Sequence, residues 1–190
     1  MKSTIHEHKK NNFYSVSKKL ILTLVIIFVT NFTFAQSVFD KYEGNDQITS
    51  VIVSKKMFEL MSNVKVDMKD KEAQQYFALI KKLENLKVFT TDNVKLATDM
   101  KATVASYLKS NPLEELMRIN DEGKKVNIYI KSGSSDKIVK ELLMFIEPNA
   151  KDAQAVILSL TGNFNLDELS ALTEKMSLPG GEELKKAAKK

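Results

Sequence analysis

Residues 113–160 read LEELMRINDEGKKVNIYIKSGSSDKIVKELLMFIEPNAKDAQAVILSL. Val126, Ile128 and Ile130 alternate with more polar residues, which is the period of a strand with one covered face. Turn residues interrupt the stretch at 121–123, 133–135 and 147–149. The four segments between the turns are Leu113–Asn120, Lys124–Ser132, Ile138–Ile146 and Ala153–Leu160. Four consecutive strands joined by short turns predict an antiparallel meander.

Upstream of the meander, helical and strand-like periods follow one another. We expect a strand at 48–53, a helix at 55–64, a helix after Asp70, a strand at 86–91 and a long helix from 92 to 111. In the first helix, Ser54 is the expected N-cap and Met57, Leu60, Met61 and Val64 form the expected apolar face. Downstream, residues 161–163 should close the last strand, and Leu166, Leu169, Leu172 and Met176 indicate a final helix.

The order of these elements predicts the fold class. Strand, helix, helix, strand, helix, four strands and helix form an α+β pattern, with helices mainly on one face of a mostly antiparallel sheet. We expect a single domain over residues 36–178, and a disordered basic tail over 179–190 because that segment has little apolar content.

The first 35 residues have the pattern of a secretory signal peptide. A basic stretch ends at Lys18-Lys19, an apolar run spans 20–29, and small residues follow, so we expect cleavage between Ala35 and Gln36. The alternative is an uncleaved inner-membrane anchor through residues 20–34, although a membrane span needs about 20 apolar residues. Apart from this segment, nothing in the sequence predicts contact with a membrane.

Removal of the leader changes the charge balance. The leader has five lysines and one acid, so the mature chain has 29 − 5 = 24 basic and 24 − 1 = 23 acidic residues. A net charge near +1 gives no support for nucleic-acid binding.

The residue types that remain after cleavage restrict the chemistry. Both histidines, His6 and His8, belong to the leader, and the chain has no cysteine. Ser/His/Asp triads, Cys/His pairs and the usual zinc ligands are therefore excluded from the mature chain. We expect no enzymatic activity and no cofactor.

Two acidic patterns have a structural explanation. Glu114 and Glu115 are adjacent on a strand and point to opposite faces, and Asp121-Glu122 precedes Gly123 in a turn, so we expect both pairs to be solvated. The alternating residues Asn163, Asn165 and Asp167, with Glu174, resemble a calcium loop, but Glu168 stands where the loop needs glycine. Asn165 and Glu168 form a capping-box pattern instead, so we expect no metal site.

A binding surface is the remaining candidate site. Tyr129, Asn127 and Lys131 share the wetter face of a central strand, and Arg118 lies on the neighbouring strand. Tyrosine and arginine are frequent interface anchors. Segments 140–146 and 156–158 are apolar on both faces. Helices cover only one face of the sheet well, so we expect the other face to be covered by the chain itself, by a partner or by an apolar ligand.

Three stretches carry a family resemblance. They are FDKYEGNDQITSVIVSKKMFELM at 39–61, EELMRINDEGKKVNIYIK at 114–131 and AVILSLTGNFNLDELSAL at 155–172. They resemble an uncharacterised family of exported Bacteroidetes proteins, domain of unknown function 4252, over residues 39–176. Many such relatives look like lipoproteins with a cysteine at the cleavage site, whereas this chain has Gln36 there.

The resemblance implies a cell-envelope setting but no substrate and no catalytic residues. We therefore expect an exported, periplasmic or extracellular, non-enzymatic domain that binds an envelope protein through its exposed sheet face. The alternative is a periplasmic carrier of a small apolar ligand. The sequence leaves the oligomeric state open.

Overall fold

A computed structural model of the chain describes residues 37–63, 71–121, 123–135, 137–149, 154–169 and 181–183. The chain divides into two units, Met1–Val38 and Phe39–Lys190. The expected leader, its cleavage site at Ala35 and Gln36, and the alternative anchor at 20–34 lie outside the described residues. All the described strands belong to the second unit.

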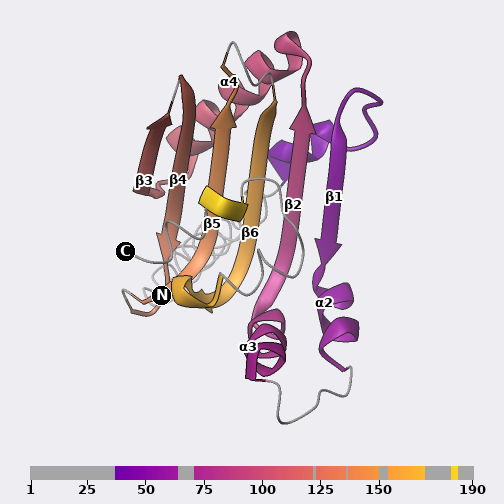
Figure 1. The fold of residues 1–190 in the computed structure, drawn as a ribbon, viewed down its shortest axis with the longest axis vertical. Coiled ribbons are helices and arrows are strands. Elements are labelled where there is room, and N and C mark those ends of the chain that lie inside the picture. Colours follow the sequence, from indigo (N-terminus) through magenta and orange to yellow (C-terminus); the bar gives the residue numbers. More distant parts are fainter. Residues whose placement is uncertain are drawn as a thin grey trace, which may run out of the picture. The chain divides into compact units, whose positions relative to one another are not determined.

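Six antiparallel strands form one sheet in the order β1-β2-β6-β5-β4-β3 (Figure 1). The strands are β1 (Thr49–Ser54), β2 (Leu83–Thr91), β3 (Glu114–Asp121), β4 (Lys124–Ser132), β5 (Ile138–Glu147) and β6 (Ala155–Asn165). Because β3, β4, β5 and β6 are neighbours in chain order, the predicted meander is confirmed, and β2 adds to its β6 edge.

Helices come before and after β2. They are the 3-10 helix η1 (Ser37–Tyr42), α2 (Lys55–Ser62), α3 (Lys71–Ile80), α4 (Val94–Ser110) and the 3-10 turn η2 (Leu166–Glu168). The α+β fold class is confirmed. The Asn93 side chain caps α4 by accepting hydrogen bonds from the backbone N–H groups of Lys95 and Leu96, at 2.9 and 3.1 Å, as its place before the apolar period predicts.

The core on one face of the sheet includes side chains of α2, of α3 and of the first residues after β6. This core takes alternate residues of four central strands: Leu86 and Val88; Val156, Leu158 and Leu160; Leu142, Met144 and Ile146; Val126, Ile128 and Ile130. Phe58 of α2, Leu79 and Ile80 of α3, and Phe164 join this core. Burying each such side chain contributes about 1.5–3 kcal/mol.

The opposite face packs against α4 and η1 (Figure 1). α4 contacts chiefly β5 and β6, and its buried residues are Ala97, Met100, Thr103, Val104 and Tyr107. Phe39 and Tyr42 of η1 are buried beside it, and their rings lie 5.1 Å from Tyr107 and 5.7 Å from Phe89 of β2. We call this the α4 face of the sheet; only part of it lies beneath the helix.

Two details of the helices differ from the sequence prediction. In α2 the buried residue is Phe58, whereas Met57 and Leu60, expected on the apolar face, are exposed. The reason is that α2 directly continues β1, so the strand fixes which side of the helix meets the core. Ser54 precedes α2 as expected but its side chain makes no capping hydrogen bond. Asp70 and Val64 lie outside the described residues.

The end of the meander also differs. β6 continues through residues 161–163, which were expected to close it. The Asn163 backbone N–H donates to the Lys82 carbonyl, 2.9 Å away, and pairing of Phe164 and Asn165 with β5 extends the strand to Asn165. The next residues begin as the 3-10 turn η2, with Leu169 buried. Leu172 and Met176 of the expected final helix lie outside the described residues.

No helix in the described ranges is long and apolar enough to span a membrane. Of the predicted tail, residues 181–183 are described and form a helical turn, in which the Glu183 carboxylate lies 3.4 Å from the Lys124 ammonium group.

Candidate functional site

The four residues predicted as a binding surface lie together. Asn127, Tyr129 and Lys131 alternate along β4 and lie opposite Phe145, Leu143 and Glu141 of β5, respectively, on the α4 face of the sheet. Arg118 of β3 lies opposite Asn127. The structure therefore brings all four onto one face, near the β3 edge, and we call them the β4 patch.

A bulge in β3 adds a fifth residue, Glu115, which was expected only to be solvated. Glu115 pairs with Tyr129 and Met117 with Ile128, so Leu116 is an extra residue without a partner in the ladder. Glu115 and Arg118 consequently share a face, although residues three apart in a regular strand point to opposite faces. Their side chains form an ion pair at 2.5 Å.

The charges of this pair act on Tyr129. Partial burial, followed by the negative charge of Glu115, raises the pKa of the Tyr129 phenol, and the positive charge of Arg118 opposes this shift. Tyr129 thus stays a neutral hydrogen-bond donor at physiological pH, with an aromatic ring half-exposed beside a guanidinium group. Such a combination suits recognition of a protein surface.

A buried acid adjoins the β4 patch. Glu141 of β5 lies across from Lys131 and only 6% of it is exposed. The Tyr107 hydroxyl of α4 donates to Glu141 Oε1 at 2.5 Å. This pair was not predicted from the sequence, although Glu141 occupies the same alternating positions as Leu143 and Phe145, a signal that an acid lies on a covered face.

The environment of Glu141 disfavours its charge. Burial raises the pKa of the Glu141 carboxyl, while the Tyr107 hydrogen bond and the positive charge of Lys131 act in the opposite direction. Burial, together with the Glu141 carboxylate, also raises the pKa of Tyr107. The pair joins α4 to β5 beneath the helix, and its chemistry is one charge-assisted hydrogen bond.

We predict that Glu141→Gln makes the stability of the domain less dependent on pH. The folded-state pKa of Glu141 lies above its ordinary value of 4.5, so the unfolded state loses this proton first, and the stability of the native chain falls as pH rises through that window. Glutamine keeps a carbonyl acceptor for Tyr107 and does not titrate. In urea unfolding from pH 4 to pH 8, the free energy of unfolding of the variant should increase relative to that of the native chain as the pH rises. A difference in free energy that stays constant over this range would contradict the prediction.

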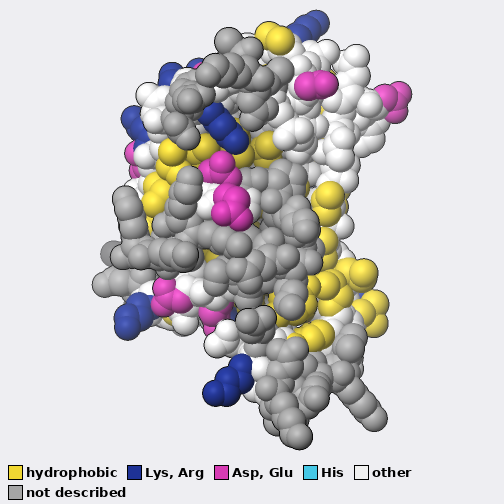
Figure 2. All heavy atoms as spheres, in the orientation of Figure 1, with side chains coloured by type: hydrophobic (Ala, Val, Ile, Leu, Met, Phe, Trp, Pro, Cys, Tyr) yellow, Lys and Arg dark blue, Asp and Glu magenta, His cyan; other side chains and the backbone are white. Residues whose placement is uncertain are grey.

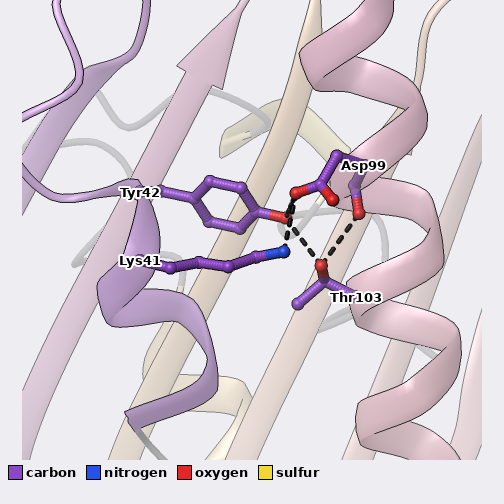
Figure 3. Close-up of polar contacts among 4 residues, drawn as sticks. All are labelled: Lys41, Tyr42, Asp99 and Thr103. Atoms are coloured by element: carbon purple, nitrogen blue, oxygen red, sulfur yellow. Dashed lines mark hydrogen bonds and ion pairs between the residues drawn. The ribbon is translucent and has the colours of Figure 1, made fainter.

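A second polar cluster fastens η1 to α4 (Figure 3). The Tyr42 hydroxyl lies 2.8 Å from Asp99 Oδ2 and 2.7 Å from Thr103 Oγ1, and Lys41 Nζ lies 2.7 Å from the same Asp99 oxygen. The Lys41 ammonium lowers the pKa of Asp99, and the Tyr42 hydroxyl adds to this effect. All the polar groups of the cluster engage one another, so we interpret it as structural.

Glu168, which stands at the glycine position of the calcium-like pattern, has a role within the fold, whereas Glu174 lies outside the described residues. Glu168 Oε2 accepts a hydrogen bond from the backbone N–H of Asn165 at 3.1 Å, which is one half of the predicted capping box. Its other oxygen pairs with the Lys82 ammonium at 2.5 Å. In the described part of the chain, no three acidic side chains lie close enough together to hold a metal ion.

Two open hollows are lined by described residues. One, of about 240 Å³, lies between α4 and the end of β5, next to Val94, Ala97 and Glu147. The other, of about 270 Å³, has polar walls that include Asp46 and Thr91. Both are smaller than the usual ligand pocket of about 300–1,000 Å³, so neither favours the alternative of an apolar-ligand carrier.

Comparison with known proteins identifies the family. The comparisons with curated proteins and with solved structures gave no match. The model of the family described as "Domain of unknown function (DUF4252)" matches residues 42–172. This range begins at Tyr42 in η1, contains all six strands and includes the complete β4 patch. The chain therefore belongs to the family of domain of unknown function 4252.

Proposed function

We propose that this chain is an exported, non-enzymatic binding module that holds a protein of the cell envelope on its β4 patch. The observation that carries the proposal is the gathering of Arg118, Tyr129, Asn127 and Lys131 on one side of two paired strands. The leader pattern of residues 1–35, followed by Gln36, supports export to the periplasm or beyond a bacterial envelope. An anchor through residues 20–34 would place the same surface at the inner membrane.

The chemistry of the β4 patch favours a folded protein as partner. Arg118 and Tyr129 provide a planar cation and an aromatic ring, the side chains most enriched among interface anchors. Tyr129 lies on β4, the second strand of the sheet, which is paired on both of its edges, so its side chain has a rigid base. A rigid base lowers the conformational entropy that binding costs.

The ion pair within the patch suggests the charge of the partner. Glu115 and Arg118 are both partly exposed, at 39% and 64% of their side-chain surface, so the pair contributes little to stability and separates readily. An acidic group of the partner can take the place of Glu115 on the guanidinium, and Lys131 adds a second positive charge on the same face. We therefore expect an acidic contact surface on the partner.

The double substitution Arg118→Ala with Tyr129→Ala tests the proposal. The protein, purified from the envelope of its own host, is immobilised, and envelope extract is passed over the native and substituted forms. We expect at least one protein to be retained by the native form and reduced ten-fold or more by the double variant, since each lost anchor costs about 2 kcal/mol or more. Quantitative mass spectrometry of the eluates measures the ratio.

Two further variants make the result specific. Lys95→Ala removes an exposed positive charge from the first turn of α4 and should leave retention unchanged. Glu115→Gln frees the Arg118 guanidinium and should strengthen retention of an acidic partner. Retention of every captured protein by the double variant, with native circular dichroism, would rule out the β4 patch as the binding surface.

A further inference from the structure

The two edges of the sheet are built differently. The β3 edge has a bulge at Leu116 and charged side chains at Glu114, Glu115 and Arg118, which are features that prevent pairing with another chain. The β1 edge reads TSVIVS, without a charge or a proline, and pairs with β2 without any shift of register. Among the strands that the structure describes, none pairs with the outer side of β1.

The β1 edge is also apolar on its surface. Val51 and Ile52 are 42% and 44% exposed, and Met57 and Leu60 of the adjoining α2 are 50% and 56% exposed. Figure 2 shows hydrophobic side chains gathered on the side of the molecule where Figure 1 places β1 and α2. An apolar, straight and uncharged edge strand is a template for an added strand.

The arrangement of side chains along β1 limits how a second copy can pair with it. Val51 and Val53 lie opposite Val88 and Leu86, on the face away from α4, whereas Ile52 lies on the α4 face opposite Lys87. Residues that face each other across an antiparallel ladder lie on the same side of the sheet. In a two-fold symmetric pair of β1 strands, each residue must therefore face one that lies on the same side of the sheet. This requires that one residue, at the symmetry axis, faces the same residue of the other copy.

Centring on Ile52 gives the better match. It places Ile52 opposite Ile52 of the other copy and each Val51 opposite a Val53, so every apolar side chain meets another. Centring on Val51 places Ile52 opposite Ser50 and Val53 opposite Thr49. Cross-strand pairs of β-branched residues contribute about 0.2–1 kcal/mol each, which favours the Ile52-centred register.

The charges at the two ends of β1 point to a second copy as the occupant. Asp46 precedes the strand and Lys55 follows it, and both are exposed, whereas the charge of the next residue, Lys56, is shared with Glu59, 3.5 Å away. In an antiparallel pair, the acidic start of one strand approaches the basic end of the other on both sides of the axis. Such self-complementary charge is what a two-fold interface requires.

We propose that two copies of this chain associate through antiparallel β1–β1 pairing centred on Ile52, which joins their two six-stranded sheets into one. Met57 and Leu60 of each copy flank the junction. The two β4 patches then lie toward the opposite, β3 ends of the joined sheet, so the dimer presents two separate binding surfaces. The pairing itself does not depend on the proposed function, because β1 and the β4 patch share no residue.

Cysteine cross-linking tests the register directly. The chain has no cysteine, so a single Ile52→Cys variant, expressed with its leader and purified as the host releases it, has one thiol. The proposed axis places the two residue 52 Cβ atoms about 4.5–5.5 Å apart, close enough for a disulfide after small adjustment. Mild oxidation should give a disulfide-linked dimer on a non-reducing gel.

Two matched variants complete this test. Val94→Cys places a thiol on α4 at a side chain that is 76% exposed and distant in the chain from β1, and it should remain monomeric on the gel. Val51→Cys should also fail to cross-link, because Val51 faces Val53 of the other copy. Cross-linking of Ile52→Cys no faster than that of Val94→Cys overturns the proposal, and cross-linking of Val51→Cys in its place overturns the register.

Sedimentation velocity provides an independent measurement. The native protein should sediment as a dimer at about 50 µM, and Ile52→Lys, which introduces a charge at the centre of the edge, should sediment as a monomer with unchanged circular dichroism. Val94→Lys, which adds the same charge elsewhere, should remain a dimer. A native monomer at that concentration, or a dimeric Ile52→Lys variant, contradicts β1–β1 pairing.

Discussion

Replacing Tyr107 with alanine is expected to lower the free energy of unfolding by about 3–5 kcal/mol, the range for truncating a large buried aromatic residue. Tyr107 is 1% exposed, its ring lies 5.1 Å from the Phe39 ring, and its hydroxyl donates to Glu141. The substitution thus loosens η1, α4 and β5 together and leaves a buried carboxylate without its donor. Urea unfolding at pH 7, followed by circular dichroism, measures the loss.

Tyr107→Phe separates the two contributions. It keeps the ring and removes only the hydroxyl, so we expect a loss of about 1–3 kcal/mol, the cost of an unsatisfied buried polar group. In the Glu141→Gln background the same substitution should cost less, because the acceptor no longer has a charge. An equal loss in both backgrounds would show that the hydrogen bond does not stabilise the fold.

Gly162→Ala is expected to have the second large effect, a loss of about 3 kcal/mol, at the upper end of the range for overpacking. A Cβ atom at Gly162 would lie 2.4 Å from the Lys82 carbonyl oxygen and 3.0 Å from the Leu83 Cα. Both are backbone atoms, so no side chain can rotate to make room. β2 and β6 must separate where Asn163 donates to Lys82.

The location of this effect distinguishes it from a general loss of stability. Amide hydrogen exchange at Asn163 should accelerate more in Gly162→Ala than at the amides of β4. Gly44→Ala serves as the control, because Gly44 has a φ of +72° and open space around it, so alanine there incurs only backbone strain of about 1–2 kcal/mol. If Gly44→Ala destabilised the domain as much as Gly162→Ala, the steric explanation would be wrong.

The candidate site was partly predictable. The period of two places Asn127, Tyr129 and Lys131 on one face, and the turn before Lys124 places Arg118 opposite Asn127. By contrast, the same hairpin continued without a bulge would put Glu115 beside Ile130, on the covered face, rather than beside Tyr129. The ion pair with Arg118 depends on the extra residue in β3, and nothing in the local pattern indicates a bulge there.

The sequence by itself determined the elements that depend on neighbouring residues: the meander, the long capped helix α4 and the α+β class. Alternation, turn residues and N-caps are local, so they can be read without knowing the fold. The tertiary structure decided which side of α2 is buried, that β6 passes through Gly162, that Glu141 lies beneath Tyr107, and that β1 is an edge. These features depend on which strands and helices meet across the sheet, and contacts between residues distant in the chain leave no period in a single sequence.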